Sequence, residues 1–100
     1  MEDMASLWSK SIALHIEKLY GTNFPFWKKQ IYNMLVQKKQ VKPIKLKRVK
    51  PKAMDPEEWA EMDELAWSTI MLAMTKTVYY NVNKCVTSYD LWSKSCTIYS

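Results

Sequence analysis

The segment Asp55-Pro56-Glu57-Glu58 constrains the fold of this 100-residue chain more strongly than any other stretch. It combines a carboxylate at a helix N-cap, proline at the first helical position and glutamate at the third, which together mark a helix start. From Trp59 to Ala73, apolar side chains then recur at three- and four-residue steps, with acidic residues on the opposite face. The pattern predicts an amphipathic helix at about 56–74.

A second helix is predicted at about 24–39. Apolar side chains recur there at helical spacing, at Phe24, Trp27, Ile31, Met34 and Leu35. Asn23 is a suitable N-cap, and Pro25 fits because the first turn of a helix does not need the missing N–H.

The carboxyl-terminal part of the chain predicts two more helices. Val78 and Val82 indicate a short one at about 77–83. Thr87-Ser88-Tyr89-Asp90 has the capping-box arrangement and precedes an amphipathic stretch, which predicts a helix at about 88–99.

Two segments do not follow helical periodicity. Residues 1–20 alternate apolar and polar side chains around Leu14, which favours an extended arm. Residues 40–54 contain Pro43 and Pro51, which exclude a stable helix interior and indicate an extended connector. We therefore expect a small all-α domain of three to four helices at 21–100. Its predicted core comprises Trp27, Ile31, Leu35, Trp59, Met62, Ala66, Ile70 and Trp92.

Composition excludes several classes of function. The single glycine rules out a glycine-rich phosphate loop, and His15, Cys85 and Cys96 are too few and too widely spaced for a structural zinc site. No nucleophile has a histidine placed beside it by sequence spacing. We expect no enzymatic activity, cofactor, metal or small-molecule substrate, and two cysteines that behave as buried hydrophobes.

No apolar run approaches the about 18–20 residues of a membrane span, and the amino end lacks a basic signal-peptide start. We therefore expect no membrane association and an intracellular, cytoplasmic protein, with a nuclear location as the alternative.

The net charge of +5 is unevenly distributed. No acidic residue occurs between Lys18 and Met54, whereas Asp55–Glu64 is strongly acidic. Three interpretations stay open for the basic segment 38–52: contact with RNA or another polyanion, a solvated connector, or pairing with the acidic helix face within or between molecules. The absence of aromatic residues from this segment argues against a dedicated single-strand reader. Its cations are Lys38, Lys39, Lys42, Lys45, Lys47, Arg48, Lys50 and Lys52.

Two of the five tryptophans stand apart from the predicted apolar stripes. Trp67 lies off the centre of its helix's stripe, and Trp8 lies in the polar arm. Because exposed tryptophan is a common anchor at protein interfaces, both are candidate contact residues.

Several motifs resemble the Gag polyproteins of copia-type retrotransposons. Gly21-Thr22-Asn23-Phe24 with Trp27 is similar to the family's G-x-N-(Y/F)-x-x-W opening. The segment 57–72 is similar to its E-(D/E)-W-x-x-x-D-x-x-A-x-x-x-I-x-L block, and 78–99 to its V-x-x-x-V and T-(A/S)-x-x-(L/I)-W ending. The resemblance covers roughly residues 16–100.

This resemblance implies an all-α, capsid-like domain that self-associates into shells around RNA. The chain differs from the family in ending at Ser100, in lacking a CCHC zinc knuckle and in its more basic connector. The resemblance implies that the chain holds only the amino-terminal half of such a capsid, so that surfaces meant for later helices would be uncovered. A truncated element, a domesticated host gene and a fragment of a longer polyprotein all stay open. We expect a homo-oligomer whose contacts include Trp67, Leu91, Ile98 and Tyr99. The alternative is a nucleic-acid-binding helical module that uses the 38–52 segment.

Overall fold

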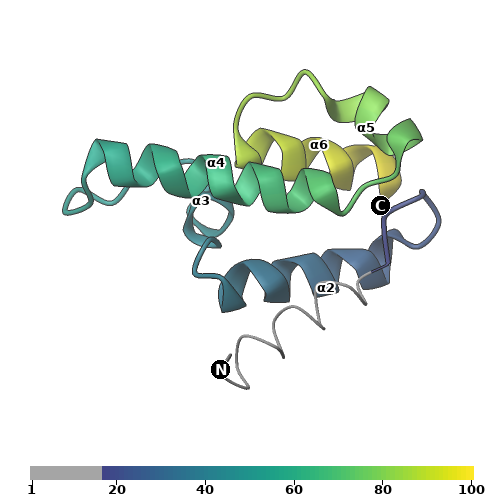
Figure 1. The fold of residues 1–100 in the computed structure, drawn as a ribbon, viewed down its shortest axis with the longest axis horizontal. Helices are drawn as coiled ribbons and strands as arrows, with labels where there is room; N and C mark the ends of the chain where they lie inside the picture. The colour runs from purple at the N-terminus through teal and green to yellow at the C-terminus, as the bar shows by residue number, and fades with distance from the viewer. Residues whose placement is uncertain (1–16) are drawn as a thin grey trace, which may run out of the picture.

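The computed structural model describes residues 17–100 (Figure 1). Within this range the chain forms five helices and no strand, which confirms the predicted all-α class. The helices are α2 (Phe24–Gln37), α3 (Lys42–Lys45), α4 (Pro56–Leu72), α5 (Lys76–Val82) and α6 (Ser88–Tyr99). Predictions for Trp8, His15 and the arm up to residue 16 lie outside the described residues.

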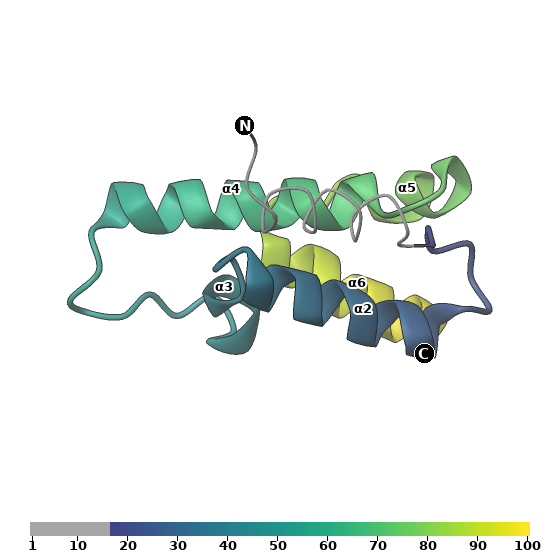
Figure 2. The ribbon, with the colours of Figure 1, turned by 60° about the horizontal axis from the view of Figure 1, so that its bottom comes forward.

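Helix α4 is the longest element, and it packs against α2, α3 and α6, whereas α5 packs against α6. In Figure 2, α2 and α6 both lie below α4, and they meet through the rings of Trp27 and Trp92. Asp55 caps α4 as predicted, because its Oδ2 accepts a hydrogen bond of 3.2 Å from the backbone N–H of Glu58. Thr87 caps α6 in the same way, because its Oγ1 accepts a hydrogen bond of 3.1 Å from the backbone N–H of Asp90.

Asn23 holds the N-cap position of α2, but its side chain makes no capping bond. Its Oδ1 accepts from the N–H of Tyr20 at 3.0 Å, and its Nδ2 donates to the carbonyl oxygen of Lys18 at 2.9 Å. The expectation of a side-chain cap was therefore wrong. Asn23 instead closes the turn that leads from the amino-terminal segment into α2.

Leu19 attaches that segment to the junction between α4 and α5. Its N–H donates to the carbonyl of Ala73 at 2.9 Å, and its own carbonyl accepts from the N–H of Thr75 at 3.0 Å. It forms a parallel bridge with Met74, and its side chain is fully buried. The last residues of the predicted arm are thus extended and paired with a distant part of the chain.

The connector between α2 and α4 is not extended throughout. Lys42–Lys45 form the short helix α3, and Pro43 and Ile44 are buried against the rest of the molecule. Pro43 is compatible with α3 because it lies within the first turn, where no N–H is required. The prediction of a purely extended connector fails at this point.

The core lies where α2, α4, α5 and α6 meet. Of the predicted core residues, Trp27, Ile31, Leu35, Ala66, Ile70 and Trp92 are buried in it. Trp59 and Met62 are only half-buried and lie outside the core cluster, which corrects that prediction. The reason is visible in Figure 1, where the first turns of α4 extend beyond the ends of α2 and α6.

Candidate functional site

The basic segment lies on the surface around α3. Lys50 is half-buried, and its Nζ donates to the carbonyl oxygens of Pro51 and Met54 at 3.0 and 2.7 Å. Arg48 reaches α6, where its guanidinium donates to both carboxylate oxygens of Asp90 at 2.9 and 3.0 Å. These two cations therefore have partners within the molecule. The exposed cations that line the remaining surface are Lys38, Lys39, Lys42, Lys45, Lys47 and Lys52.

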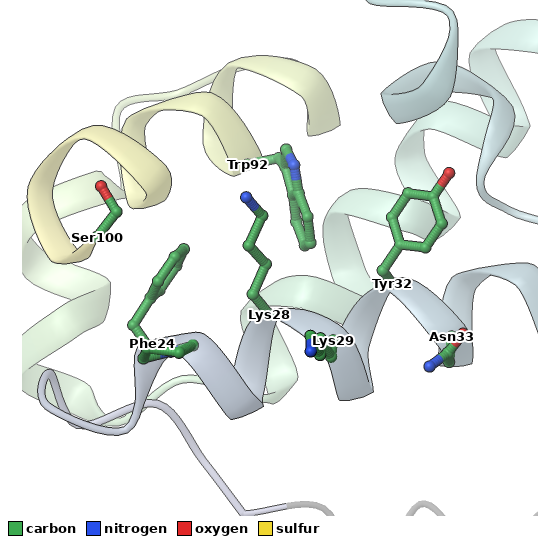
Figure 3. Close-up of a pocket in the computed structure, with 8 residues that line it drawn as sticks. Phe24, Lys28, Lys29, Tyr32, Asn33, Trp92 and Ser100 are labelled. Carbon is green, nitrogen blue, oxygen red and sulfur yellow. The ribbon is translucent and has the colours of Figure 1, made fainter.

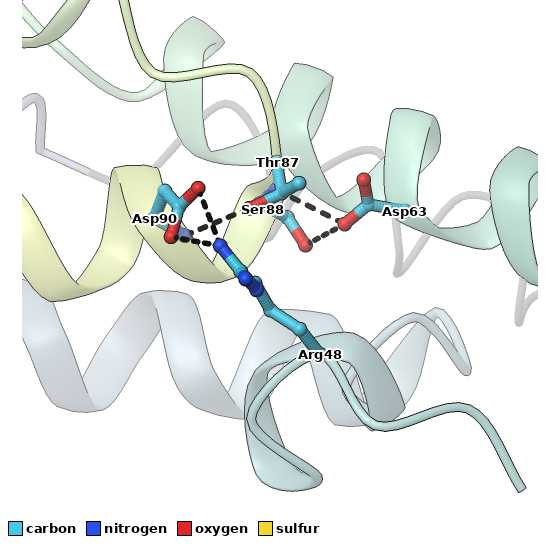
Figure 4. A network of polar contacts seen from close by, with 5 residues as sticks. All are labelled: Arg48, Asp63, Thr87, Ser88 and Asp90. Carbon is cyan, nitrogen blue, oxygen red and sulfur yellow. Dashed lines mark hydrogen bonds and ion pairs between the residues drawn. The ribbon is translucent and has the colours of Figure 1, made fainter.

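Figure 4 shows how the start of α6 is fixed between the basic segment and α4. Asp63 of α4 accepts hydrogen bonds from both the backbone N–H and the hydroxyl of Ser88, which is fully buried. On the other side Arg48 pairs with Asp90. Arg48 thus pairs with α6. The sequence had suggested a different partner within the molecule, the acidic face of α4.

Two adjoining pockets lie between α2, α3 and α6. The larger, of about 590 Å³, is lined by α2, by Trp92 of α6 and by Ser100 (Figure 3). The smaller, of about 310 Å³, is lined by α6 and the α3 region. Tyr32 and Trp92 line both pockets, so the two adjoin each other at these residues, and we call the pair the aromatic groove.

Aromatic side chains of α2 and α6 contact one another beside the aromatic groove; the rings of Trp27 and Trp92 stack, and those of the other two pairs are tilted. The ring centroids of Phe24 and Trp27 are 5.8 Å apart, those of Trp27 and Trp92 are 6.3 Å apart, and those of Trp92 and Tyr32 are 6.1 Å apart. Phe24 and Trp92 are 2% and 8% exposed, whereas Tyr32 is half-buried. Sequence reasoning missed this groove because its aromatic residues come from α2 and α6 and not from the basic segment.

The four predicted contact residues differ in exposure, and only one of them is fully buried. Leu91 is fully buried, and Trp67 is half-buried with its Nε1 donating to the carbonyl of Cys85 at 2.9 Å. Tyr99 is also half-buried, which leaves Ile98, at 43% exposure, as the most accessible of the four. The expectation that Leu91 would be uncovered was wrong, because it is fully buried in the core. The contact expected of Trp67, which is partly exposed, stays a prediction.

Other large apolar side chains are much more exposed. Leu72 at the end of α4 is 76% exposed, Tyr80 on α5 is 61% exposed, and Val86 in the following loop is 84% exposed. We call these three residues the α4–α5 edge. Helical periodicity had assigned Leu72 to the apolar stripe, but the helix ends there and no element covers it.

Cys85 and Cys96 are free and half-buried, and both pack against the core. Burial raises the pKa of the Cys85 thiol, Lys94 opposes this shift, and Asp90 adds to it. Within the described part of the chain, no three His, Cys, Asp or Glu side chains gather in a way that suits a metal ion. None of the helices in residues 17–100 combines the length and apolar character that a membrane crossing requires.

Over 89 residues, the chain is 28% identical to the retrovirus-related Pol polyprotein from transposon TNT 1-94 of Nicotiana tabacum. The chain is a distant relative of a retrotransposon polyprotein. The match includes 88% of this chain but spans only 7% of that polyprotein. No protein-family model matches the chain, and no solved structure matches it.

Proposed function

We propose that this chain is a non-enzymatic, capsid-like region of a copia-type retrotransposon Gag protein, and that its function is self-association. The observation that supports this most directly is the match to a retrotransposon polyprotein over 88% of the chain. The all-helical fold is consistent with it, and so is the ordered series of Gag-like motifs from Gly21 to Tyr99.

The exposed apolar side chains of the α4–α5 edge are the ones that best support a contact with a second copy. Leu72, Tyr80 and Val86 follow one another along a short stretch of chain and are all more than half exposed. Trp67 fixes the loop that carries Val86, because its indole binds the adjacent Cys85 carbonyl. A surface that is apolar and held in place loses little conformational entropy when a partner covers it.

Sedimentation of the full chain over a concentration series tests this proposal. The wild type is expected to associate as concentration rises. Leu72→Glu and Val86→Glu should shift it toward monomer, because each would place a carboxylate in the apolar contact. Val49→Glu is the matched control, since Val49 is 69% exposed on the connector, away from this edge. A wild type that stays monomeric throughout, or equal effects of all three variants, would refute the proposed contact.

A second candidate function is contact with RNA or another polyanion through the basic segment. The exposure of its six outward lysines favours it, because such a cluster neutralises phosphates and releases counterions. Binding of RNA should weaken steeply with salt. It should also weaken in a variant in which Lys42, Lys45, Lys47 and Arg48 are all replaced by Gln. Equal binding by this variant and the wild type would exclude the segment as the contact.

A further inference from the structure

The charges around the aromatic groove all have the same sign. Four lysines line its two pockets, and no Asp or Glu side chain does. Lys28 and Lys29 come from α2, and Lys45 and Lys47 from α3 and the residues after it. All four are exposed, and Lys28 extends between Phe24 and Trp92 (Figure 3), with its Nζ 6.0 Å from the centroid of the Phe24 ring. Lysines at both pockets therefore attract anions to the groove, although Ser100, whose terminal carboxylate is negative in this chain, also lines the larger pocket.

Between these lysines the groove presents aromatic surface. Tyr32 lies where the two pockets join, and Tyr89 lines the smaller one; both are half-buried, so part of each ring faces the groove. The ring of Trp92 packs against that of Tyr32. An acidic peptide matches the lysines but makes little use of aromatic faces, and a duplex keeps its base faces stacked inside the helix. Unpaired nucleotides supply both phosphates and free base faces.

We propose that the aromatic groove binds single-stranded nucleic acid, with one or two unpaired bases stacked against Tyr32 and Tyr89 and adjacent phosphates held by Lys28, Lys45 and Lys47. This proposal rests on the second candidate function, contact with RNA or another polyanion. It adds base stacking and a specific binding site to a contact that otherwise depends on charge alone. It does not depend on self-association. It also reverses the expectation drawn from the absence of aromatic residues in 38–52, since the fold supplies them from α2 and α6.

The test measures the fluorescence anisotropy of a short, unstructured, labelled RNA titrated with the full chain at several salt concentrations. A groove variant combines Lys28→Gln, Lys45→Gln and Lys47→Gln. A matched control combines Lys38→Gln, Lys39→Gln and Lys52→Gln, which removes the same charge from exposed lysines that line neither pocket. The groove variant should bind at least about tenfold more weakly than the control. Its slope of log affinity against log salt should also be smaller by about two, because each lost phosphate contact removes about 0.7.

Stacking is tested separately at Tyr32. Tyr32→Leu should weaken RNA binding by about 5- to 100-fold, the range observed when a stacking aromatic is removed. Tyr32→Phe keeps the ring and should bind like the wild type, and circular dichroism melting establishes that both variants are folded. An abasic phosphodiester of the same length should bind equally to Tyr32→Leu and to the wild type, because it offers no base to stack.

Three outcomes would overturn this site. Equal weakening by the groove variant and its control would leave only diffuse contact with the basic segment. Unchanged RNA binding by a folded Tyr32→Leu would exclude stacking, and equal affinity for the RNA annealed to its complement would exclude a preference for unpaired bases. If the wild type binds no RNA at low salt, both the groove and the second candidate function fail.

Discussion

The indole Nε1 of Trp27 donates a buried hydrogen bond of 2.8 Å to the carbonyl oxygen of Ala73. Ala73 is the C-cap of α4, where backbone carbonyls have no partner within the helix. The same carbonyl accepts from the N–H of Leu19 at 2.9 Å. One oxygen therefore joins the amino-terminal segment, α2 and the end of α4, and the indole that binds it also stacks on Trp92, which lines the aromatic groove.

Trp27→Phe should lower the free energy of unfolding by about 2 kcal/mol, measured by urea denaturation. The loss combines one buried hydrogen bond with the cavity left by a smaller ring, and it is limited because Leu19 still satisfies the Ala73 carbonyl. Trp59→Phe is the control, because Trp59 is half-buried outside the core cluster. Trp59→Phe should lower the free energy of unfolding by less than about 1 kcal/mol. Equal costs for the two variants would contradict the importance assigned to the Trp27 bond.

The helices were predictable from sequence because their signals are local. The capping residues Asp55 and Thr87 act within one turn, and both make the bonds that their spacing indicates. The apolar periodicity of α2 identified Trp27, Ile31 and Leu35, which are all buried. Here the sequence pattern and the tertiary packing agree because several neighbours cover the same face of each helix.

The sites were less predictable because they depend on how helices lie against one another. Leu91 was expected to be uncovered on the last helix, yet it is fully buried in the core, and Trp67, off the centre of its stripe, is half-buried. Tyr32 and Tyr89 are far apart in the chain, but they line the same pocket. Helical periodicity identifies which face is apolar, but it does not identify which end of that face stays uncovered, as at Trp59 and Leu72.

Lys39 ends α2 in a left-handed conformation, with φ at 59°. The N–H of Gln40, the next residue, reaches back to the carbonyl of Leu35 at 2.8 Å, as in a Schellman motif, where glycine is the preferred residue. Lys39→Gly should therefore raise the free energy of unfolding by about 1 kcal/mol. Lys38→Gly removes the same charge at φ −86°, where glycine brings no steric relief, and it should lower stability. A chemical denaturation series compares the two, and stabilisation by both or neither would contradict this account.

Asp63 and Asp90 both make polar contacts at the start of α6, but they should contribute very differently to the free energy of unfolding. Asp63→Ala leaves the N–H and hydroxyl of the fully buried Ser88 without their acceptor, which should cost about 1–3 kcal/mol. Asp90→Ala removes an ion pair with Arg48 whose side chains are 55% and 40% exposed, so its cost should stay below about 1 kcal/mol. Thermal melts at low and high salt check both, since salt should weaken only the Asp90 contribution. A larger effect of Asp90→Ala would contradict the ranking.

Cys85 provides a prediction about pH that does not depend on how accessible its sulfur is. Burial raises the pKa of the Cys85 thiol, so the thiolate forms at higher pH in the folded chain than in the unfolded one. Alkylation of a Cys96→Ser variant should show a pH midpoint above that of the same variant in urea, because access changes the limiting rate and not the midpoint.

The neutral thiol of Cys85 is favoured on folding, so its contribution to stability is complete below the unfolded pKa and is lost as pH rises through the folded pKa. Lys94→Gln removes the charge that lowers this pKa and should move the midpoint higher still. A folded midpoint at or below the unfolded value would show that burial does not control this thiol.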